Sequence, residues 1–304
     1  MAGFKELLAV EWDDNAVQTF KLNFPDVPVY HGDIGKLSGD ACMKLAGIKK
    51  CELDVLDGSP PCQGFSTAGK RKFDDPRNSL FKEYARLIQE LQPKVFVMEN
   101  VTGMIKGVMK QAYLQIIKTL RECGYKARGQ VLNAMYYNVP QSRERVIIIG
   151  VREDLGIEPS HPKPQTKPIS VRKAWVDLPE NNVMPAPPVT GKTLIALKQS
   201  KQGESMAKYK GSGFNAVRIS FNKPSCTLPK ALAFHRYPTI FHPIENRGLS
   251  LIETKRIGSF PDSFSFDGLW RDAIQRIGNS VPPNMMKAIA ENIKTNILEC
   301  SISK

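Results

Sequence analysis

The sequence predicts an α/β fold in which a parallel sheet, covered by helices on both faces, carries a smaller lobe that is mostly irregular or β. Up to residue 151, short apolar runs alternate with helical patterns, which favours a parallel sheet. The amino-acid composition then changes, with eight prolines between residues 158 and 188. The stretch from there to about Arg247 has short β-like runs and no convincing helical period. We therefore expect a sheet domain of residues 1–175 plus 275–304 and a lobe of residues 176–274.

The elements of the sheet domain follow from hydrophobic period and from stop signals. Strands are expected at 6–11, 27–31, 53–57, 95–98, 127–133 and 146–151, and helices after the N-cap Asp13 and at 40–47, 79–91 and 111–122. The pattern at 79–91 is the strongest, because Leu80, Tyr84, Leu87, Ile88 and Leu91 share one face. A last helix, at 284–297, carries an apolar stripe that is expected to pack back on the sheet.

Composition limits the classes of protein to consider. The 304 residues, 41% hydrophobic and 24% charged, suit an ordinary globular protein with one substantial core. No apolar run reaches membrane-spanning length, and the first residues lack a signal-peptide pattern. Six scattered cysteines without a C-x-x-C pair predict no metal site and no disulfide framework, and favour a reducing cytoplasm.

Positive charge is concentrated in the lobe. The net charge is +13, and residues 190–236 hold nine Lys or Arg against the single acid Glu204. Such an excess is typical of a surface that binds a phosphate backbone. A solvated basic surface with no partner is an equally good interpretation of charge alone.

A single cysteine follows the buried strand at 53–57. Gly58 and two prolines end that strand and leave Cys62 on a rigid turn at its carboxyl end. Ligands and catalytic groups gather at this edge of open α/β sheets. A free cysteine most often packs in a core, but its place in Gly-Ser-Pro-Pro-Cys-Gln favours a nucleophile.

Four motifs together resemble one enzyme family. Pro-Pro-Cys-Gln at 60–63, Glu-Asn-Val at 99–101, Gln-Ser-Arg-Glu-Arg at 141–145 and Gly-Asn-Ser-Val-Pro-Pro at 278–283 stand in the order and spacing of DNA cytosine methyltransferases that act at ring carbon 5. The resemblance covers nearly the whole chain. It implies a Rossmann-like, S-adenosylmethionine-dependent methyltransferase sheet, with the basic lobe as target-recognition region and duplex DNA as partner. The resemblance implies a prokaryotic restriction-modification or orphan enzyme that acts as a monomer.

The resemblance also assigns the chemistry. A cytosine flipped out of the duplex is attacked at carbon 6 by Cys62, and carbon 5 then takes the methyl group. Glu99 is expected to donate a proton to the ring nitrogen, and Arg145 to bind the carbonyl oxygen. Arg143 either orients Glu99 or grips a phosphate, and an ion pair at the strand edge is the structural alternative for both arginines.

The cofactor side is assigned in the same way. In nucleotide-binding sheets an acid at the end of the second strand takes the ribose hydroxyls; Glu11 has that place, and Trp12 offers a face to adenine. Asp33 and Ile34 are expected at the adenine, although Asp33 is also an ordinary turn residue. The resemblance adds Pro61, Leu80, Asn279, Ser280 and Val281 as walls of the cofactor site.

The expected DNA contacts lie in two regions. The polar segment after the nucleophile, with Gln63, Ser66, Lys70 and Arg71, is predicted to close over DNA as a lid, or else to be a plain surface loop. Thr227, Leu228 and Arg247 resemble markers of the recognition lobe. Two positions depart from the family pattern: Ile252 stands where arginine is usual, and Asn138 where glycine is frequent.

A glycine-rich loop should lie about 20 residues before Glu11, which places it ahead of Met1. We expect a start codon placed too late, a short partner polypeptide that carries the loop, or a decayed enzyme. Two further functions therefore stay open: a tRNA cytosine methyltransferase on the same catalytic frame, and a catalytically silent DNA-binding relic.

Overall fold

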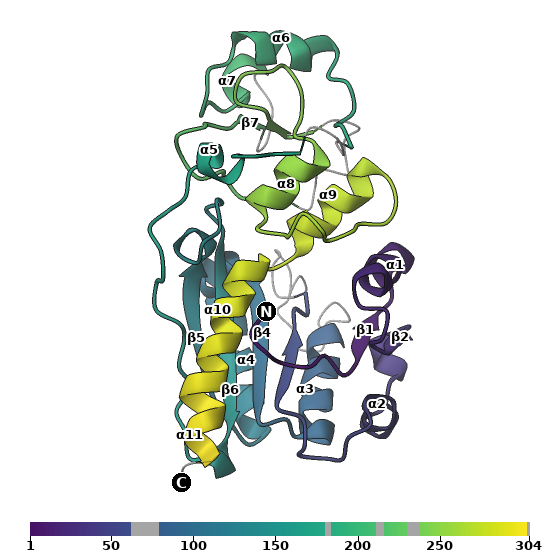
Figure 1. Ribbon diagram of the computed structural model, residues 1–304. Helices are drawn as coiled ribbons and strands as arrows, with labels where there is room; N and C mark the ends of the chain where they lie inside the picture. Colours follow the sequence, from purple (N-terminus) through teal and green to yellow (C-terminus); the bar gives the residue numbers. More distant parts are fainter. Residues whose placement is uncertain (62–78, 180–183, 211–215, 230–237, 303–304) are drawn as a thin grey trace.

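The computed structural model describes residues 1–61, 79–179, 184–210, 216–229 and 238–302. Figure 1 shows two bodies, a lower one built on the sheet and an upper one that we call the upper lobe, residues 171–279. Within the described ranges, no helix is both long and apolar enough to cross a membrane.

The lower body holds two groups of strands. β1 (Ala9–Glu11) pairs in parallel with β2 (Val29–His31), and β3 (Val55–Gly58) in parallel with β4 (Val95–Val101). β6 (Glu144–Arg152) then pairs antiparallel with both β4 and β5 (Tyr125–Asn133), giving the order β3-β4-β6-β5. The expected parallel sheet is therefore confirmed for β1 to β4 and wrong for β5 and β6. These two strands form a hairpin, because the chain between them makes only the short helix η6 (Ala134–Tyr136) and no crossover helix.

The predicted helices of the lower body are all present. They are α1 (Asp14–Asn23), α2 (Gly39–Ala46), α3 (Ser79–Leu91), α4 (Lys110–Glu122) and α10 (Pro283–Ile293), which continues through a π-helical turn (Lys294–Leu298) into α11 (Glu299–Ile302). Short 3-10 helices join them: η1 (Ile34–Lys36), η4 (Thr102–Ile105), η5 (Gly107–Met109) and η7 (Glu153–Leu155). Asp13 caps α1 as predicted, since its Oδ1 accepts a hydrogen bond from the Ala16 amide at 3.0 Å.

Helices cover both faces of the four-stranded sheet (Figure 1). Alternate residues of β4 point to opposite sides, so Phe96 and Met98 pack with α3 and α4, whereas Val95 and Val97 pack with α10. The predicted docking of the last helix on the sheet is confirmed by Ile289, which is fully buried in the second cluster.

The upper lobe is largely irregular, as predicted, but its regular elements are mainly helices. They are α5 (Val171–Ala174), α6 (Gly191–Gln199), α7 (Ala207–Lys210), α8 (Leu251–Ile257) and α9 (Trp270–Asn279), with one pair of two-residue strands, β7 (Val217–Arg218) and β8 (Ile240–Phe241). Helix α6 was missed because only Ala196 and Leu197 of its residues are buried, too few for a readable period. Val171 and Ile277 pack in one cluster of this lobe, so we propose domain boundaries slightly outside 176–274.

Candidate functional site

The carboxyl ends of β3 and β4 lie side by side and define the candidate site. Gly58 pairs with Met98, so the Pro60–Pro61 turn leaves the sheet next to Glu99. The Asn100 side chain donates a hydrogen bond to the Pro60 carbonyl at 3.1 Å. The two strand ends are therefore tied together directly before Cys62. Cys62 itself lies outside the described residues.

Tyr84 supports the same place from helix α3. Its buried hydroxyl lies 2.8 Å from the Val97 carbonyl and 3.2 Å from the Leu56 carbonyl. Burial raises the pKa of this phenol well above its ordinary value, so it stays a hydrogen-bond donor. The Tyr84 hydroxyl therefore links β3 to β4 at Val97, two residues before Glu99.

Glu99 and Arg145 meet across the β4–β6 pair. Arg145 lies opposite Val101 in the antiparallel register, and its Nε is 2.7 Å from Glu99 Oε1. Each side chain is 14% exposed, so the pair is mostly shielded but open to a small molecule. The Nε–H bond is not directed at the carboxylate, and within the described residues this buried nitrogen has no hydrogen-bond partner. The guanidinium also donates through Nη1 to the Glu144 carbonyl at 2.7 Å. The two residues expected at the reacting base are thus together, with donor capacity to spare.

Arg143 has contacts that differ from both predicted roles. Its side chain is 2% exposed and donates to the Leu228 carbonyl at 3.0 Å and to the Gly278 carbonyl at 2.9 Å. Burial, and secondarily the nearby positive charge of Arg145, lowers its pKa to about 10. We correct the prediction accordingly: in this structure Arg143 neither bonds Glu99 nor faces solvent, but ties β6 to the upper lobe.

The cofactor residues lie at the ends of β1 and β2. Oε1 of Glu11 accepts from the amides of Trp12 at 2.8 Å and Asp13 at 3.0 Å, whereas Oε2 has no hydrogen-bond partner among the described residues. The Trp12 side chain is 79% exposed. Asp33 is exposed and its Oδ1 accepts from the Gly35 amide at 2.9 Å, so its alternative role as a turn residue is realised. A free carboxylate oxygen beside an open indole fits a ribose and an adenine.

The other residues predicted to line the cofactor site differ in their burial and contacts. Ile34 is half-buried and packs against the cluster of α2 and α3, while Pro61 and Leu80 are exposed on either side of the residues outside the description. Asn279 is exposed at the end of α9. After it, the Ser280 hydroxyl donates to the Ile277 carbonyl at 2.8 Å, and Val281 packs beneath the sheet.

The predicted DNA contacts in the upper lobe serve its internal structure instead. Leu228 is 1% exposed in the lobe core, which corrects its assignment to DNA. The Thr227 hydroxyl donates to the Ser142 carbonyl at 2.8 Å. Arg247 is bound by Glu253 and Glu245, the former at 2.8 Å, and these hydrogen bonds hold its pKa above the ordinary value. Arg218, counted in the basic stretch, is likewise buried on carbonyls. Gln63, Ser66, Lys70 and Arg71 lie outside the described residues.

Gln141 begins the motif at 141–145, and the sequence predicts no role for it. It is 2% exposed, accepts from the Leu228 amide at 3.1 Å and donates to the Ile257 carbonyl at 3.4 Å. Together with Arg143 it forms the connection between β6 and the upper lobe. Its partners are 87 and 116 residues away in sequence, so spacing could not reveal them. Asn138, by contrast, has φ 57°, the left-handed conformation that asparagine tolerates where glycine is frequent.

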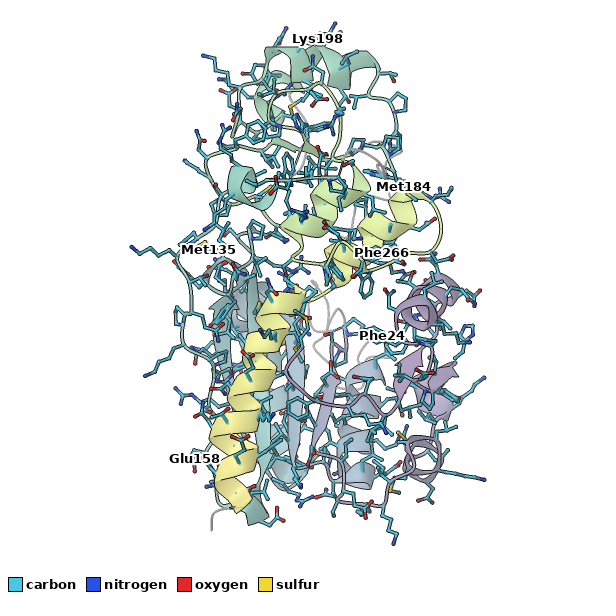
Figure 2. The ribbon with its side chains drawn as sticks, viewed as in Figure 1. Phe24, Met135, Glu158, Met184, Lys198 and Phe266 are labelled. Atoms are coloured by element: carbon cyan, nitrogen blue, oxygen red, sulfur yellow. The ribbon has the colours of Figure 1, made fainter. Side chains whose placement is uncertain are left out.

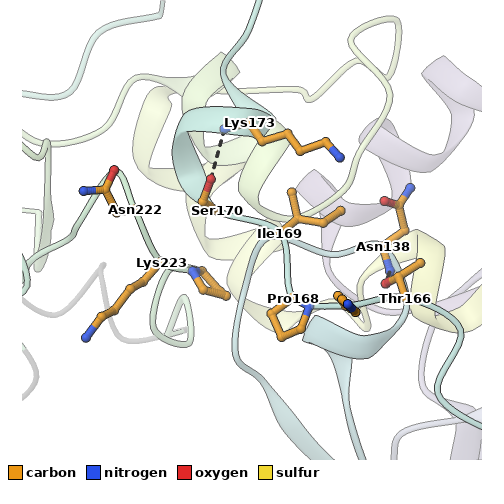
Figure 3. Close-up of a pocket in the computed structure, with 10 residues that line it drawn as sticks. Asn138, Thr166, Pro168, Ile169, Ser170, Lys173, Asn222 and Lys223 are labelled. Atoms are coloured by element: carbon orange, nitrogen blue, oxygen red, sulfur yellow. Dashed lines mark hydrogen bonds between the residues drawn. The ribbon is translucent and has the colours of Figure 1, made fainter.

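A cavity of about 510 Å³ lies where the lower body joins the upper lobe (Figure 3). It is lined by Asn138, Thr166, Lys167, Pro168, Ile169, Ser170, Lys173, Asn222, Lys223 and Pro224. None of the predicted catalytic or cofactor residues that the structure describes borders it. We therefore place the site at the ends of β3, β4 and β6, where Glu99 and Arg145 lie.

Comparison with known proteins identifies a family whose model matches the chain. The model for the C-5 cytosine-specific DNA methylase family matches residues 1–295. The chain is 36% identical to the type II methyltransferase M1.HphI of Haemophilus parahaemolyticus, over 96% of this chain and 81% of that protein. It is 34% identical to M.Sau96I of Staphylococcus aureus, over 96% and 71%.

Solved structures share the fold. A putative DNA modification methyltransferase encoded within an Escherichia coli prophage superposes with a TM-score of 0.79 at 23% identity, covering 98% of this chain and 94% of the other. A DNMT2 variant of Spodoptera frugiperda gives 0.66 at 21% identity, over 95% and 91%. Both likenesses support the α/β architecture described above.

Proposed function

The chain belongs to the C-5 cytosine-specific DNA methylase family, and we propose that the ends of its strands β3, β4 and β6 carry out that reaction. The enzyme transfers a methyl group from S-adenosylmethionine to carbon 5 of cytosine in DNA. The observation that carries the assignment of residues is the shielded pair of Glu99 and Arg145 beside the proline turn.

We propose that Cys62 is the nucleophile. Its sulfur bonds to carbon 6 of the flipped cytosine, and the electron pair of the 5,6 double bond moves toward the ring nitrogen and carbonyl. Glu99 donates a hydrogen bond or proton at that nitrogen, and Arg145 donates to the carbonyl oxygen, where negative charge develops. Bound S-adenosylmethionine would supply the methyl group to carbon 5 and leave as S-adenosylhomocysteine, its sulfur keeping the electron pair of the broken bond. Loss of the carbon-5 proton returns the electron pair and expels the Cys62 thiolate.

The ion pair gives Arg145 a second task. In the free enzyme Arg145 Nε lies against Glu99, whereas during the reaction one arginine has to serve both the carboxyl group and the base. The guanidinium carries five N–H donors, so Arg145 can stay beside Glu99 and still donate to the base. The structure of the pair thus supports Arg145 as a stabiliser of developing charge.

Cofactor binding is proposed for the ends of β1 and β2. Glu11 Oε2 is available to accept from ribose hydroxyls, and the exposed Trp12 ring to stack on adenine. Asp33 and Ile34, together with Pro61, Leu80 and the segment 279–281, complete the walls of this proposed site.

Duplex DNA is the substrate of this family, and we propose that the upper lobe reads its sequence. The lysines of this lobe supply phosphate contacts, while Leu228 and Arg247 act from within its fold. We further propose a monomeric restriction-modification enzyme of the cytoplasm and nucleoid.

A mechanism-based trap tests the proposal. DNA duplexes that contain 5-fluorocytosine should form a covalent adduct with the protein when S-adenosylmethionine is present, because fluorine cannot leave as the carbon-5 proton does. Replacing the nucleophile, Cys62→Ser, should abolish the adduct, and Cys300→Ser, at an exposed cysteine far along the chain, should leave it unchanged. The adduct is read as a band resistant to denaturation. An adduct that survives Cys62→Ser would refute the assignment, and tRNA containing 5-fluorocytosine should give none.

A further inference from the structure

Three residues that begin at the end of β1 carry the first of the proposed cofactor contacts. They are Glu11, Trp12 and Asp13, and we call them the cofactor turn. The Glu11 carbonyl accepts from the Gly32 amide at 3.0 Å, so β2 fixes the backbone where the strand ends. The Trp12 side chain is 79% exposed, and core packing therefore does not hold it. The direction of the cofactor turn depends instead on the contacts of Asp13.

Asp13 is bound from the upper lobe. Its Oδ1 caps α1 by accepting from the Ala16 amide at 3.0 Å, and the same oxygen contacts the guanidinium of Arg276 in α9. Arg276 also donates through Nε to Asn15 Oδ1 at 3.1 Å. Its side chain is 18% exposed, so water competes little for these bonds. One guanidinium thus spans the residue before α1 and the second residue of that helix.

The stability of α1 does not explain why an arginine stands at this place. The N-terminus of a helix carries a partial positive charge, which favours acids in the first turn and disfavours cations. Asp14 has the favourable sign there, and Arg276 has the unfavourable one. The position of the arginine is therefore accounted for by its hold on Asp13 and Asn15.

Arg276 is also tied to the other half of the proposed cofactor site. Ile274 and Ile277 hold α9 in the core of the upper lobe. The Arg276 carbonyl accepts from the Ser280 amide at 3.0 Å, where α9 ends and the proposed wall segment 279–281 begins. Through its backbone and its side chain, Arg276 links segment 279–281 to the cofactor turn.

The rest of α1 docks on the upper lobe through other contacts (Figure 1). Asn15, Thr19 and Asn23 are spaced by four residues and share one face of the helix. Asn15 Nδ2 donates to the Asp267 carbonyl at 3.0 Å, and Thr19 Oγ1 accepts from the Asp267 amide at 3.1 Å. Asn23 exchanges two hydrogen bonds with the Ser265 backbone, each at 2.8 Å. Shortening the arginine leaves these contacts in place, so anchoring of the turn can be separated from docking of the lobe.

We propose that Arg276 is a positioning residue of the cofactor site. It acts through Asp13, and so holds the Glu11 carboxylate and the Trp12 ring in place relative to segment 279–281. The site is then preorganised, and S-adenosylmethionine does not have to order the turn when it binds. The roles of Glu11 and Trp12 rest on the proposed function, whereas the anchoring of the turn does not.

Amide hydrogen exchange on the 304-residue protein tests the anchoring without a ligand. Arg276→Gln should speed exchange of the Trp12 and Asp13 amides at least about fivefold, because both are bonded within the cofactor turn. The Ser265 amide should be unchanged in this variant. Asn23→Ala should do the reverse, since it removes the acceptor of the Ser265 amide. Unchanged Trp12 and Asp13 amides in Arg276→Gln would overturn the proposal.

Equilibrium binding of radiolabelled S-adenosylmethionine tests the role in the cofactor site. Arg276→Gln should raise the Kd about tenfold. Arg276→Lys should raise it less, because an ammonium group can keep the pair with Asp13 without the bond to Asn15. Asn23→Ala should keep the wild-type Kd. At saturating cofactor, Arg276→Gln should reach the wild-type kcat for methylation, with a raised KM for the cofactor.

The other outcomes are distinct. Faster exchange in Arg276→Gln with an unchanged Kd would overturn the role in cofactor binding. A lower kcat with an unchanged KM would also overturn it and would assign Arg276 to the fold alone. Failure of the proposed function has a different signature: the wild-type protein would not bind the cofactor, or Glu11→Gln and Trp12→Ala would leave the Kd unchanged. Hydrogen exchange alone would then sustain or refute the anchoring of the turn.

Discussion

Arg145 and Arg143 stand two residues apart, yet their side chains do different things. Arg145 stays beside Glu99 at the edge of the proposed base pocket, while Arg143 is buried on two carbonyls of the upper lobe. Buried guanidinium groups persist only where acceptors satisfy them. We therefore treat Arg145 as catalytic and Arg143 as a positioning residue.

Arg145→Lys should lower the rate of the chemical step by about 100- to 1,000-fold, because an ammonium group cannot serve both Glu99 and the carbonyl oxygen. Single-turnover methylation of a cognate duplex measures this, with DNA affinity measured separately. Arg128→Lys, at an exposed arginine on the neighbouring β5, is the matched control and should keep the wild-type rate. A loss of affinity with an unchanged single-turnover rate would assign Arg145 to DNA binding instead.

At this scale the sequence predicts chemistry better than contacts. Glu99 and Arg145 were expected at the same base, and they form the ion pair that was the structural alternative for the arginines. The partners of Arg143 are 85 and 135 residues distant, and no local pattern encodes such carbonyls. Leu228 was assigned to DNA from its motif, whereas the lobe core buries it, because burial depends on the tertiary fold rather than on the motif.

At the scale of elements, β4 and β6 form the centre of the four-stranded sheet and meet with very little room. Gly150 of β6 pairs with Phe96 of β4, and a β-carbon placed on Gly150 would lie 2.0 Å from the Phe96 ring. The ring occupies the volume that any larger residue would need. Glycine here is a packing requirement of the pair.

Gly150→Ala should reduce the free energy of unfolding by about 1–3 kcal/mol through overpacking. Urea denaturation followed by circular dichroism measures the loss. Gly103→Ala is the control, since a β-carbon there meets nothing within 4 Å and the change should be nearly neutral. Equal stabilities of the two variants would show that Phe96 can move aside.

Strong periodicity explains which elements were predictable. The range of α3 was predicted to the residue, because its buried face repeats without interruption. The direction of β5 and β6 was not, since an apolar run has the same appearance in either orientation. Only the connection between two strands distinguishes an antiparallel hairpin from a parallel crossover. The sequence of residues 134–143 has no helical pattern, and this alone did not decide between the two.

At the scale of the whole molecule, the upper lobe touches the lower body on two sides. Gln141 and Arg143 bind it next to β6. On the other side, α1 binds the segment before α9: Asn23 Nδ2 donates to the Ser265 carbonyl at 2.8 Å, and Arg276 contacts Asp13. The candidate site lies between these two connections. Figure 2 labels two residues at the second connection, Phe24 of the lower body and Phe266 of the upper lobe.

The two bodies should respond differently to acid because of His242 in the upper lobe. Its Nδ1 accepts from the Glu245 amide at 2.9 Å, and its ring stacks on Trp175 at 5.5 Å. Desolvation, and then Arg247 and Arg218, lower its pKa below the ordinary 6.5, outweighing Glu253 and Glu245. The folded lobe thus holds neutral His242, while the unfolded lobe takes up a proton below pH 6.5. Stability is complete above that pH and falls below it.

We expect the lobe to lose up to about 1.4 kcal/mol per pH unit below that range. Trp175 fluorescence during urea denaturation at a series of pH values follows it, with far-ultraviolet circular dichroism reporting the sheet. His242→Gln should flatten the pH dependence of the fluorescence transition, and the exposed His31→Gln should not. The same slope in wild type and His242→Gln would exclude this histidine as the cause.

The upper lobe enters the chain after β6 and leaves it before α10, so both of its ends return to one body. Such an insertion can be exchanged during evolution without disturbing the strands that hold the chemistry. A replacement lobe need only offer carbonyl acceptors where Leu228 and Gly278 now stand, and an amide for Gln141. New sequence specificities could therefore be acquired by grafting, with Arg143 and Gln141 acting as a fixed coupling.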